Sequence, residues 1–203
     1  MNVSLENIGK KYQYHWVFRN LTHDLRGPLH FGITGNNGSG KSTLLKIISG
    51  YNTPSEGKIR WSINGTDISA NLFRFVGLAS PHQDIYDEFS LEEIIDFHKK
   101  FKQLINGENS RSLIRLSGLT KSADKPIKYF SSGMKQRVKI VLAMLFDNPL
   151  VILDEPCSNF DEQAIVWYQK IVEEYAGEKL LVIGSNSPET ECFSCKEFIH
   201  LSV

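Results

Sequence analysis

The glycine-rich segment GNNGSGKS, from Gly35 to Ser42, is the strongest chemical pattern in the sequence. It follows a short apolar run and continues into TLLKIISG, which predicts a helix that ends at Gly50. Such a loop points backbone N–H groups and the positive end of the next helix at an anion. The spacing G-x-x-x-x-G-K-[ST] is typical of nucleoside triphosphate sites, where Lys41 would reach the β- and γ-phosphates and Ser42 would ligate Mg²⁺.

A second segment, LVILDEP, supplies carboxylates for the same chemistry. Asp154 and Glu155 come directly after four apolar residues that are typical of a buried strand. A phosphate loop of this kind needs an acidic group at a neighbouring strand end to hold the metal, and Asp154 is the candidate. Glu155 would lie on the γ-phosphate side and act as the base that orients and deprotonates water, which is worth about 10²–10⁴-fold in rate.

A third segment, FSSGMKQR, is a small-residue turn that runs straight into a predicted helix. The N-terminus of a helix is itself an anion site, because its N–H groups and dipole point outward together. The phosphate loop already provides one such site. The question is therefore which phosphate this second site would hold, and on which molecule.

Composition excludes several classes of protein. The 203 residues contain 23 Lys and Arg against 23 Asp and Glu, so the formal net charge is zero and no general nucleic-acid-binding surface is expected. Cys157, Cys192 and Cys195 are an odd number, which favours free thiols in a reducing compartment. Cys192 and Cys195 have metal-ligand spacing, but no second pair completes a zinc site. No apolar run approaches the ~18–20 residues of a membrane span.

The order of apolar runs predicts an α/β fold, a nucleotide-binding core with a largely parallel sheet. Short β-branched runs at 28–34, 73–79, 150–153 and 180–184 alternate with helical patterns. Alternation of apolar and polar residues near the start predicts an antiparallel β part, and Asn64-Gly65 predicts a hairpin.

Residues from about 84 to 128 are predicted to form an inserted helical subdomain. Ser90 and Glu93 form a capping-box pattern, and apolar residues follow at helical spacing as far as Ile105. A second short helix is expected at 110–117, ending at Gly118. We expect one domain over 1–203, with its core at about 1–83 and 129–203.

Taken in order, GNNGSGKST, FSSGMKQR, VILDEP and SNFD (158–161) resemble the ATPase subunits of ABC transporters, members of the P-loop NTPase superfamily. The resemblance spans nearly the whole chain. It implies that ATP and Mg²⁺ are the cofactors and that two subunits meet head to tail around two nucleotides. FSSGMKQR corresponds to the family's signature, usually LSGGQ followed by QR. Ser131, Ser132 and Gly133 would thus bind the γ-phosphate of the ATP held by the other subunit.

The resemblance also assigns two further residues. Asp161 would couple the two sites across the dimer, and Tyr12 would stack on adenine, although an ordinary strand-end tyrosine is the alternative. Together, motif and resemblance assign the following residues to the nucleotide: Tyr12, Gly35, Asn36, Asn37, Gly38, Ser39, Gly40, Lys41, Ser42, Thr43, Ser131, Ser132, Gly133 and Asp161.

Three segments depart from the family pattern. Ser132 and Met134 replace Gly and Gln of the signature, which predicts weaker closure of the dimer. The family's metal-contacting Gln falls in register with Pro81; Gln83 follows closely and would reach the metal after a loop shift, so the metal candidates are Ser42, Asp154 and Gln83. Asn186 takes the place of a His that contacts the γ-phosphate. Asn can donate a hydrogen bond but carries no proton or charge, so slow turnover is expected if the charge matters.

The expected function is that of an ATP-binding and hydrolysing subunit of an ABC transporter, with Glu155 and Asn186 as catalytic residues. Its partners would be a second ATPase subunit, identical or different, and separate integral membrane permease subunits. The subunit would lie in the cytoplasm, peripheral to the inner face of the membrane, with no nucleic-acid partner. Two alternatives stay open: a nucleotide-gated regulatory module with little turnover, and a non-transport ABC ATPase.

Overall fold

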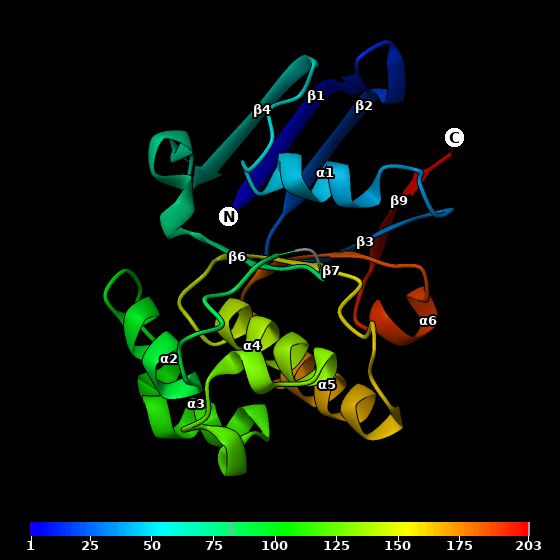
Figure 1. Cartoon of the computed structure of the whole chain (residues 1–203). Coiled ribbons are helices and arrows are strands. Elements are labelled where there is room, and N and C mark those ends of the chain that lie inside the picture. Colours follow the sequence, from blue (N-terminus) through cyan, green and yellow to red (C-terminus); the bar gives the residue numbers. More distant parts are fainter. Residues whose placement is uncertain (82, 203) are drawn as a thin grey trace.

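The structure, a computed structural model, describes residues 1–81 and 83–202, which form two β-sheets and the helices that cover them (Figure 1). The antiparallel sheet has the order β2-β1-β4-β5, and the parallel sheet has the order β6-β7-β8-β3-β9. The strands are β1 (Asn2–Tyr12), β2 (His15–Arg26), β3 (His30–Gly35), β4 (Glu56–Ile63), β5 (Thr66–Asp67), β6 (Val76–Ala79), β7 (Leu150–Asp154), β8 (Leu180–Gly184) and β9 (Glu197–Leu201).

Helices cover both faces of the parallel sheet. Helix α1 lies between the two sheets, whereas α4 and α5 pack on the opposite face (Figure 1). No helix in the described part of the chain is both long enough and apolar enough to cross a bilayer. The α-helices are α1 (Lys41–Ile48), α2 (Leu91–Lys99), α3 (Ser110–Ser117), α4 (Ser132–Met144), α5 (Glu162–Tyr175) and α6 (Pro188–Glu191).

The central strands β7 and β8 are buried along their whole length. Successive side chains of a strand point to opposite faces of the sheet. Accordingly, Leu150 and Ile152 of β7 join the core around α1, while Val151 and Leu153 join the core around α4 and α5. A strand covered on both faces must be apolar at every position, which explains the unbroken apolar runs in the sequence.

The predicted hairpin is present between β4 and β5. Asn64 and Gly65 connect these strands with φ angles of 51° and 80°. Positive φ at both central residues is what a type I′ turn requires, and Asn-Gly meets that requirement at low cost. The sequence prediction of a hairpin here is therefore confirmed, as is the antiparallel pairing of β1 with β2.

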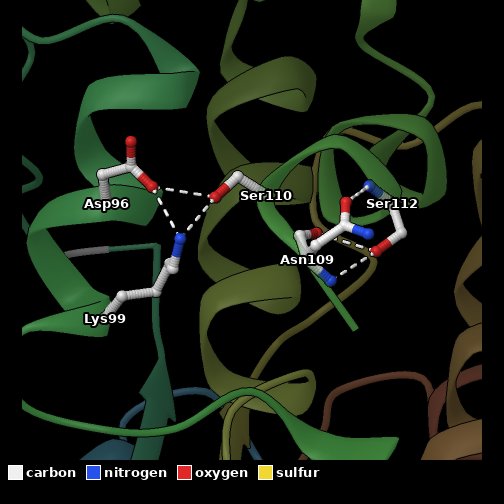
Figure 2. A network of polar contacts seen from close by, with 5 residues as sticks. All are labelled: Asp96, Lys99, Asn109, Ser110 and Ser112. Atoms are coloured by element: carbon white, nitrogen blue, oxygen red, sulfur yellow. Dashed lines mark hydrogen bonds and ion pairs between the residues drawn. The ribbon is translucent and has the colours of Figure 1, made fainter. Parts of the chain in front are cut away.

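The helices α2 and α3 form the insert between β6 and α4. Both start with a capping box, Ser90 with Glu93 for α2 and Asn109 with Ser112 for α3. Figure 2 shows how the two helices are joined: Asp96 Oδ1 accepts hydrogen bonds from Lys99 Nζ at 3.1 Å and from Ser110 Oγ at 2.8 Å. The start of α3 is thereby fixed to the middle of α2.

The predicted fold class is confirmed, but two element boundaries are wrong. Helix α2 ends at Lys99, and Ile105 lies in the separate 3₁₀ turn Ile105–Gly107, because the chain tightens into i→i+3 hydrogen bonds at the helix end. The strand expected from residue 73 begins only at Val76, since Ser69–Arg74 forms 3₁₀ turns. Further 3₁₀ turns are Thr120–Ser122 and Ile127–Tyr129, and α3 ends at Gly118 as predicted.

Two lysines, the buried Lys179 and the half-buried Lys102, donate hydrogen bonds to Asn148. Lys179 is only 7% exposed, and its Nζ donates to the carbonyl oxygens of Phe146 and Asn148 at 3.2 and 3.1 Å. Burial lowers the pKa of Lys179 to about 8, with the Asp147 carboxylate opposing. Burial, together with the nearby Lys179 ammonium, also lowers the pKa of Lys102 to about 8.

The lowered pKa values of these lysines predict that the free energy of unfolding rises with pH in the alkaline range. A lysine with a folded pKa of about 8 and an unfolded pKa of about 10.5 binds its proton more weakly in the folded state. The free-energy cost of burying the charged lysine is therefore fully present below about pH 8 and is relieved as the pH rises towards 10.5. We expect the free energy of unfolding of the wild type to increase relative to Lys179→Met over this window, by at most about 1.4 kcal/mol per pH unit per proton.

Urea unfolding at several alkaline pH values measures this difference. Lys170→Met, at an exposed position on α5, controls for the loss of one positive charge. A difference between wild type and Lys179→Met that stays constant across the window would contradict the prediction.

Candidate functional site

The predicted site residues lie at the carboxyl ends of neighbouring parallel strands. The phosphate loop follows β3, Asp154 ends β7, and Asn186 lies just beyond β8, which runs between these two strands. Gln83 follows β6, the neighbour of β7 on the other side. Parallel strands bring their carboxyl ends to one edge of the sheet, where open α/β sheets bind ligands. The topology thus gathers four segments that are distant in the sequence.

The phosphate loop has the positive-φ backbone that its glycines allow, at Gly35, Gly38 and Gly40. Gly40 caps α1 with φ 99°, and a Cβ there would lie 2.4 Å from Val17 Cγ1. The Nζ of Lys41 donates to the carbonyl oxygens of Gly35 and Asn36 at 2.8 and 3.0 Å, so it lies over the loop. A cavity of about 250 Å³ separates the loop from the proposed base, and it is lined by Val17, Asn37, Gly38, Gly40, Lys41, Ser42, Thr43 and Glu155.

The metal candidates surround a second cavity of about 290 Å³. Asp154 is 3% exposed, and its Oδ1 accepts from Ser42 Oγ at 3.1 Å. Gln83 lines the same cavity, and its Oε1 is buried without a hydrogen-bond partner among the described residues. A carboxylate, a hydroxyl and an unpartnered amide oxygen are the ligands that Mg²⁺ prefers, so this donor set fits a magnesium ion. His82 lies outside the described residues.

Glu155 and Asn186 are in direct contact. The Nδ2 of Asn186 donates to Glu155 Oε1. Glu155 has φ 44°, in the left-handed region that favours glycine, and its backbone N–H donates to the carbonyl oxygen of Gly184 at 2.8 Å. Two neighbouring strands therefore fix the position of this carboxylate: β7 through the chain and β8 through the hydrogen bond.

The signature segment is exposed and ordered by its own cap. The Oγ of Ser131 accepts from the backbone N–H of Met134 at 3.2 Å, and Ser131 and Ser132 are both exposed. A Cβ at Gly133 would lie 3.1 Å from the carbonyl oxygen of Asn159, so the SNFD loop passes close to the signature. Asp161 caps α5, with its Oδ1 accepting from Ala164 N at 2.8 Å.

Within the described residues, no hydrogen bond joins the signature to the phosphate loop of the same chain. The structure therefore brings the phosphate loop, Asp154, Glu155 and Asn186 together, and leaves Ser131, Ser132 and Asp161 outside that group.

Tyr12 lies at the end of β1 in the antiparallel sheet, where it pairs with His15 of β2. Its side chain is half exposed, and the Nζ of Lys10 lies 5.3 Å from its ring centroid. An exposed ring with one face towards a cation leaves the other face available for a flat aromatic ligand.

Sequence reasoning missed three polar residues behind the site. Ser80 Oγ donates to Asp154 Oδ2 at 3.1 Å, and Lys139 of α4 donates to the carbonyl oxygen of Ser80 at 2.9 Å. The buried carboxylate of Glu191 accepts from Cys157 N at 2.8 Å and from the hydroxyl of Ser185. No sequence motif marks these residues. The available signal was only that each is polar in, or next to, an apolar stretch.

Glu191 connects the loops on either side of Glu155. Its carboxylate holds Cys157, in the loop after β7, and Ser185, in the loop after β8, while its backbone carbonyl accepts from Tyr168 OH at 2.8 Å. Burial raises the pKa of Glu191, and the carboxylates of Glu155 and Asp154 also raise it, whereas the bonds from Ser185 and Cys157 oppose the shift.

With the geometry in place, comparison with known proteins identifies the family. The family model described as "ABC transporter" matches residues 18–158. The chain belongs to the ABC transporter family. It is 30% identical over 185 residues to the uncharacterized ABC transporter ATP-binding protein YcbN of Bacillus subtilis, covering 89% of this chain but only 60% of that protein's length. It is 27% identical over 199 residues to the lantibiotic transport ATP-binding protein SrtF of Streptococcus pyogenes, covering 97% of this chain and 85% of SrtF.

Solved structures of ABC proteins share the fold. The structure of an ATP-binding subunit of an ABC transporter matches with a TM-score of 0.84 and 28% identity, over 99% of this chain and 86% of that one. A dimeric ATP-binding cassette in a post-hydrolysis state, bound to ADP and Pi, matches with a TM-score of 0.80 and 22% identity, over 98% and 94% of the two chains. The resemblance to ABC ATPase subunits seen in the sequence is therefore confirmed.

Replacing Glu191 with Ala should destabilise this ABC protein strongly. The change leaves the Cys157 N–H and the Ser185 hydroxyl without their acceptor in a buried site. Each orphaned group costs about 1–3 kcal/mol, so we expect the free energy of unfolding to fall by about 2–4 kcal/mol. Urea unfolding measures the loss.

Glu189→Ala is the matched control, since Glu189 is exposed on the same short helix α6. Glu191→Gln keeps an acceptor oxygen, so its free energy of unfolding should fall by less than that of Glu191→Ala. If Glu191→Ala were as stable as Glu189→Ala, the structural role of this carboxylate would be refuted.

Proposed function

We propose that this chain is the Mg-ATP-hydrolysing subunit of an ABC transporter and drives a separate transmembrane partner. The observation that carries the proposal is the gathering of Lys41, Asp154 and Glu155 around two adjoining cavities at one sheet edge. Family membership supports ATP binding and hydrolysis, because the family consists of ABC transporter cassettes.

The roles of the residues follow from their geometry. The N–H groups of the loop from Gly35 to Thr43 bind the phosphates, and Lys41 leaves its loop carbonyls to pair with the β- and γ-phosphate oxygens. Ser42, Asp154 and Gln83 hold Mg²⁺, which supplies positive charge to the phosphate oxygens. Tyr12 stacks on the adenine.

Hydrolysis requires a base on the γ-phosphate side. Glu155 lines the cavity in front of the phosphate loop and accepts the proton of the attacking water. Asn186, which donates to the Glu155 carboxylate, orients this base and donates to the γ-phosphate. Because Asn carries no charge, we propose that turnover is slow.

Each active site takes its remaining groups from a second subunit. Ser131, Ser132, Gly133 and Asp161 are not joined to the phosphate loop of their own chain within the described residues, and the first two are exposed. They are therefore free to bind the γ-phosphate held by a facing subunit. A structural neighbour bound to ADP and Pi is dimeric, which supports this arrangement, in which ATP closes the dimer and hydrolysis reopens it.

The helical insert is proposed to face the membrane permease. A cavity of about 330 Å³ opens between β6 and α2, with Tyr86, Phe97 and His98 in its wall. Tyr86 is exposed, whereas Phe97 and His98 are half-buried, and aromatic side chains around such a hollow are typical of protein contacts. The subunit would then lie on the cytoplasmic face of the membrane.

A second candidate function is a nucleotide-gated regulator with little turnover. Asn186 in place of His, Pro81 in place of Gln and Ser132 in place of Gly favour it. The contact of Asn186 with an intact Glu155 favours hydrolysis instead.

The Mg-ATP hydrolysis rate of the purified chain should rise faster than linearly with protein concentration, because each site needs a second subunit. Lys41→Ala should reduce the rate to background, and Glu155→Gln should lower it by about 10²–10⁴-fold. A phosphate-release assay over a range of protein concentrations measures this. A wild-type rate equal to that of Lys41→Ala would rule out a self-sufficient ATPase and favour the regulator.

Asn186→His should raise kcat several-fold with little change in KM, because the imidazole adds a proton and a charge at the γ-phosphate. The variant should also gain a pH dependence near the ordinary histidine pKa of about 6.5. Rates across pH 5.5–8.5 test both points, with Asn186→Ala as the comparison that removes the donor. An unchanged kcat in Asn186→His would show that Asn186 already does all that this position requires.

A further inference from the structure

The end of β6 and the end of β7 leave the sheet side by side. Ala79 pairs with Leu153 in parallel register, so the next residues, Ser80 and Asp154, are direct neighbours. Ser80 Oγ donates to Asp154 Oδ2 at 3.1 Å, and Ser42 Oγ donates to Asp154 Oδ1 at 3.1 Å. Each oxygen of the carboxylate thus has one hydroxyl partner, and the two serines hold it from opposite sides.

Ser80 belongs to the same cavity as the metal candidates. It is 5% exposed and lines the cavity of about 290 Å³ together with Ser42, Gln83 and Asp154. Groups that hydrogen-bond a ligating carboxylate fix its orientation, and their loss typically costs 10–100-fold in metal affinity or activity. The position of Ser80 is therefore that of a residue that orients Asp154 for a metal.

Lys139 fixes the backbone of Ser80 from the other side. Its side chain reaches from α4, and its Nζ donates to the carbonyl oxygens of Ser80 and Pro81 at 2.9 and 3.0 Å. Lys139 is 8% exposed; burial lowers its pKa, and the Asp84 carboxylate opposes this. Among the described residues, these two carbonyl oxygens are the hydrogen-bond partners of the buried Lys139 ammonium. The ammonium therefore holds the loop firmly, because breaking either bond would leave a buried charge with fewer partners.

The same helix presents the signature. Lys139 lies about two turns after the start of α4, which is capped by Ser131. The hydrogen bonds therefore form a continuous path from Asp154 through Ser80 and Lys139 to the helix that carries Ser131, Ser132 and Gly133.

We propose that Ser80 is the positioning residue for the metal-holding Asp154 and that Lys139 couples Ser80 to α4. This path connects the metal site to the signature helix, a connection that Pro81 cannot make. The inference deepens the proposed function and rests on it. Magnesium nucleotide bound in one subunit thereby biases the orientation of the signature that the same subunit offers to the facing one.

The test measures magnesium dependence rather than turnover. In a Glu155→Gln background, which removes the base, sedimentation measures dimer formation with ATP as Mg²⁺ is titrated. Ser80→Ala should raise the Mg²⁺ concentration for half-maximal dimer formation by about 10-fold or more. Ser80→Thr keeps the hydroxyl and should restore the parent titration. Binding of a fluorescent ATP analogue without Mg²⁺ should be the same in all three proteins.

The link to α4 is tested in the same assay. Lys139→Met should weaken Mg-ATP-dependent dimer formation by about 10-fold while leaving nucleotide binding without Mg²⁺ unchanged. Lys170→Met is the control, because it removes the same charge from an exposed position on α5, outside the signature. Circular dichroism checks folding, and Lys139→Gln, which keeps a neutral donor, replaces Lys139→Met if the latter does not fold.

The outcomes separate the two proposals. A Ser80→Ala titration that overlays the parent overturns the role of Ser80, and Lys139→Met behaving like Lys170→Met overturns the link to α4. If the Glu155→Gln parent binds Mg-ATP but never dimerises, the dimeric mechanism fails, and the Mg²⁺ dependence of analogue binding by Ser80→Ala still decides the role of Ser80. A parent that binds no nucleotide overturns both proposals.

Discussion

The parallel pairing of β6, β7, β8 and β3 is the constraint on which the rest of the structure depends. It brings four chain segments to one edge and fixes their order, with the phosphate loop and the Asp154 carboxylate on either side of β8. The pairing needs helices on both faces, because strands buried in this way have apolar side chains on each side. Helices α1 and α4 are therefore part of the site, since one carries Ser42 and the other supplies Lys139.

Behind the site, buried charges are satisfied by neutral groups rather than by opposite charges. Lys139 donates to two backbone carbonyls, and the Glu191 carboxylate accepts from a backbone N–H and a hydroxyl. A neutral partner fixes the geometry of a charged group without cancelling its field. The region behind the phosphate loop therefore combines a fixed backbone with buried charges that are not neutralised by opposite charges.

The sequence was sufficient for the fold class, the phosphate loop and the two carboxylates after β7, because each depends on short-range patterns of residue type. The hairpin at Asn64 and the start of α2 were predictable for the same reason. The end of α2 and the start of β6 were not, since tight turns override apolar spacing there. Ser80, Lys139 and Glu191 were missed because their partners are distant in sequence: Glu191 meets Cys157 only once the sheet is assembled.

The left-handed backbone of Glu155 affects which substitutions are favoured at this position in evolution. A φ of 44° costs a residue with a side chain of order 1 kcal/mol or more, whereas glycine adopts it freely. Selection for stability alone would therefore drive this position towards glycine, and in the mechanism proposed above the need for a carboxylate base opposes that drift. In a lineage that no longer needed ATP turnover, this residue would be among the first to be lost, and the cassette would become more stable as it became inactive.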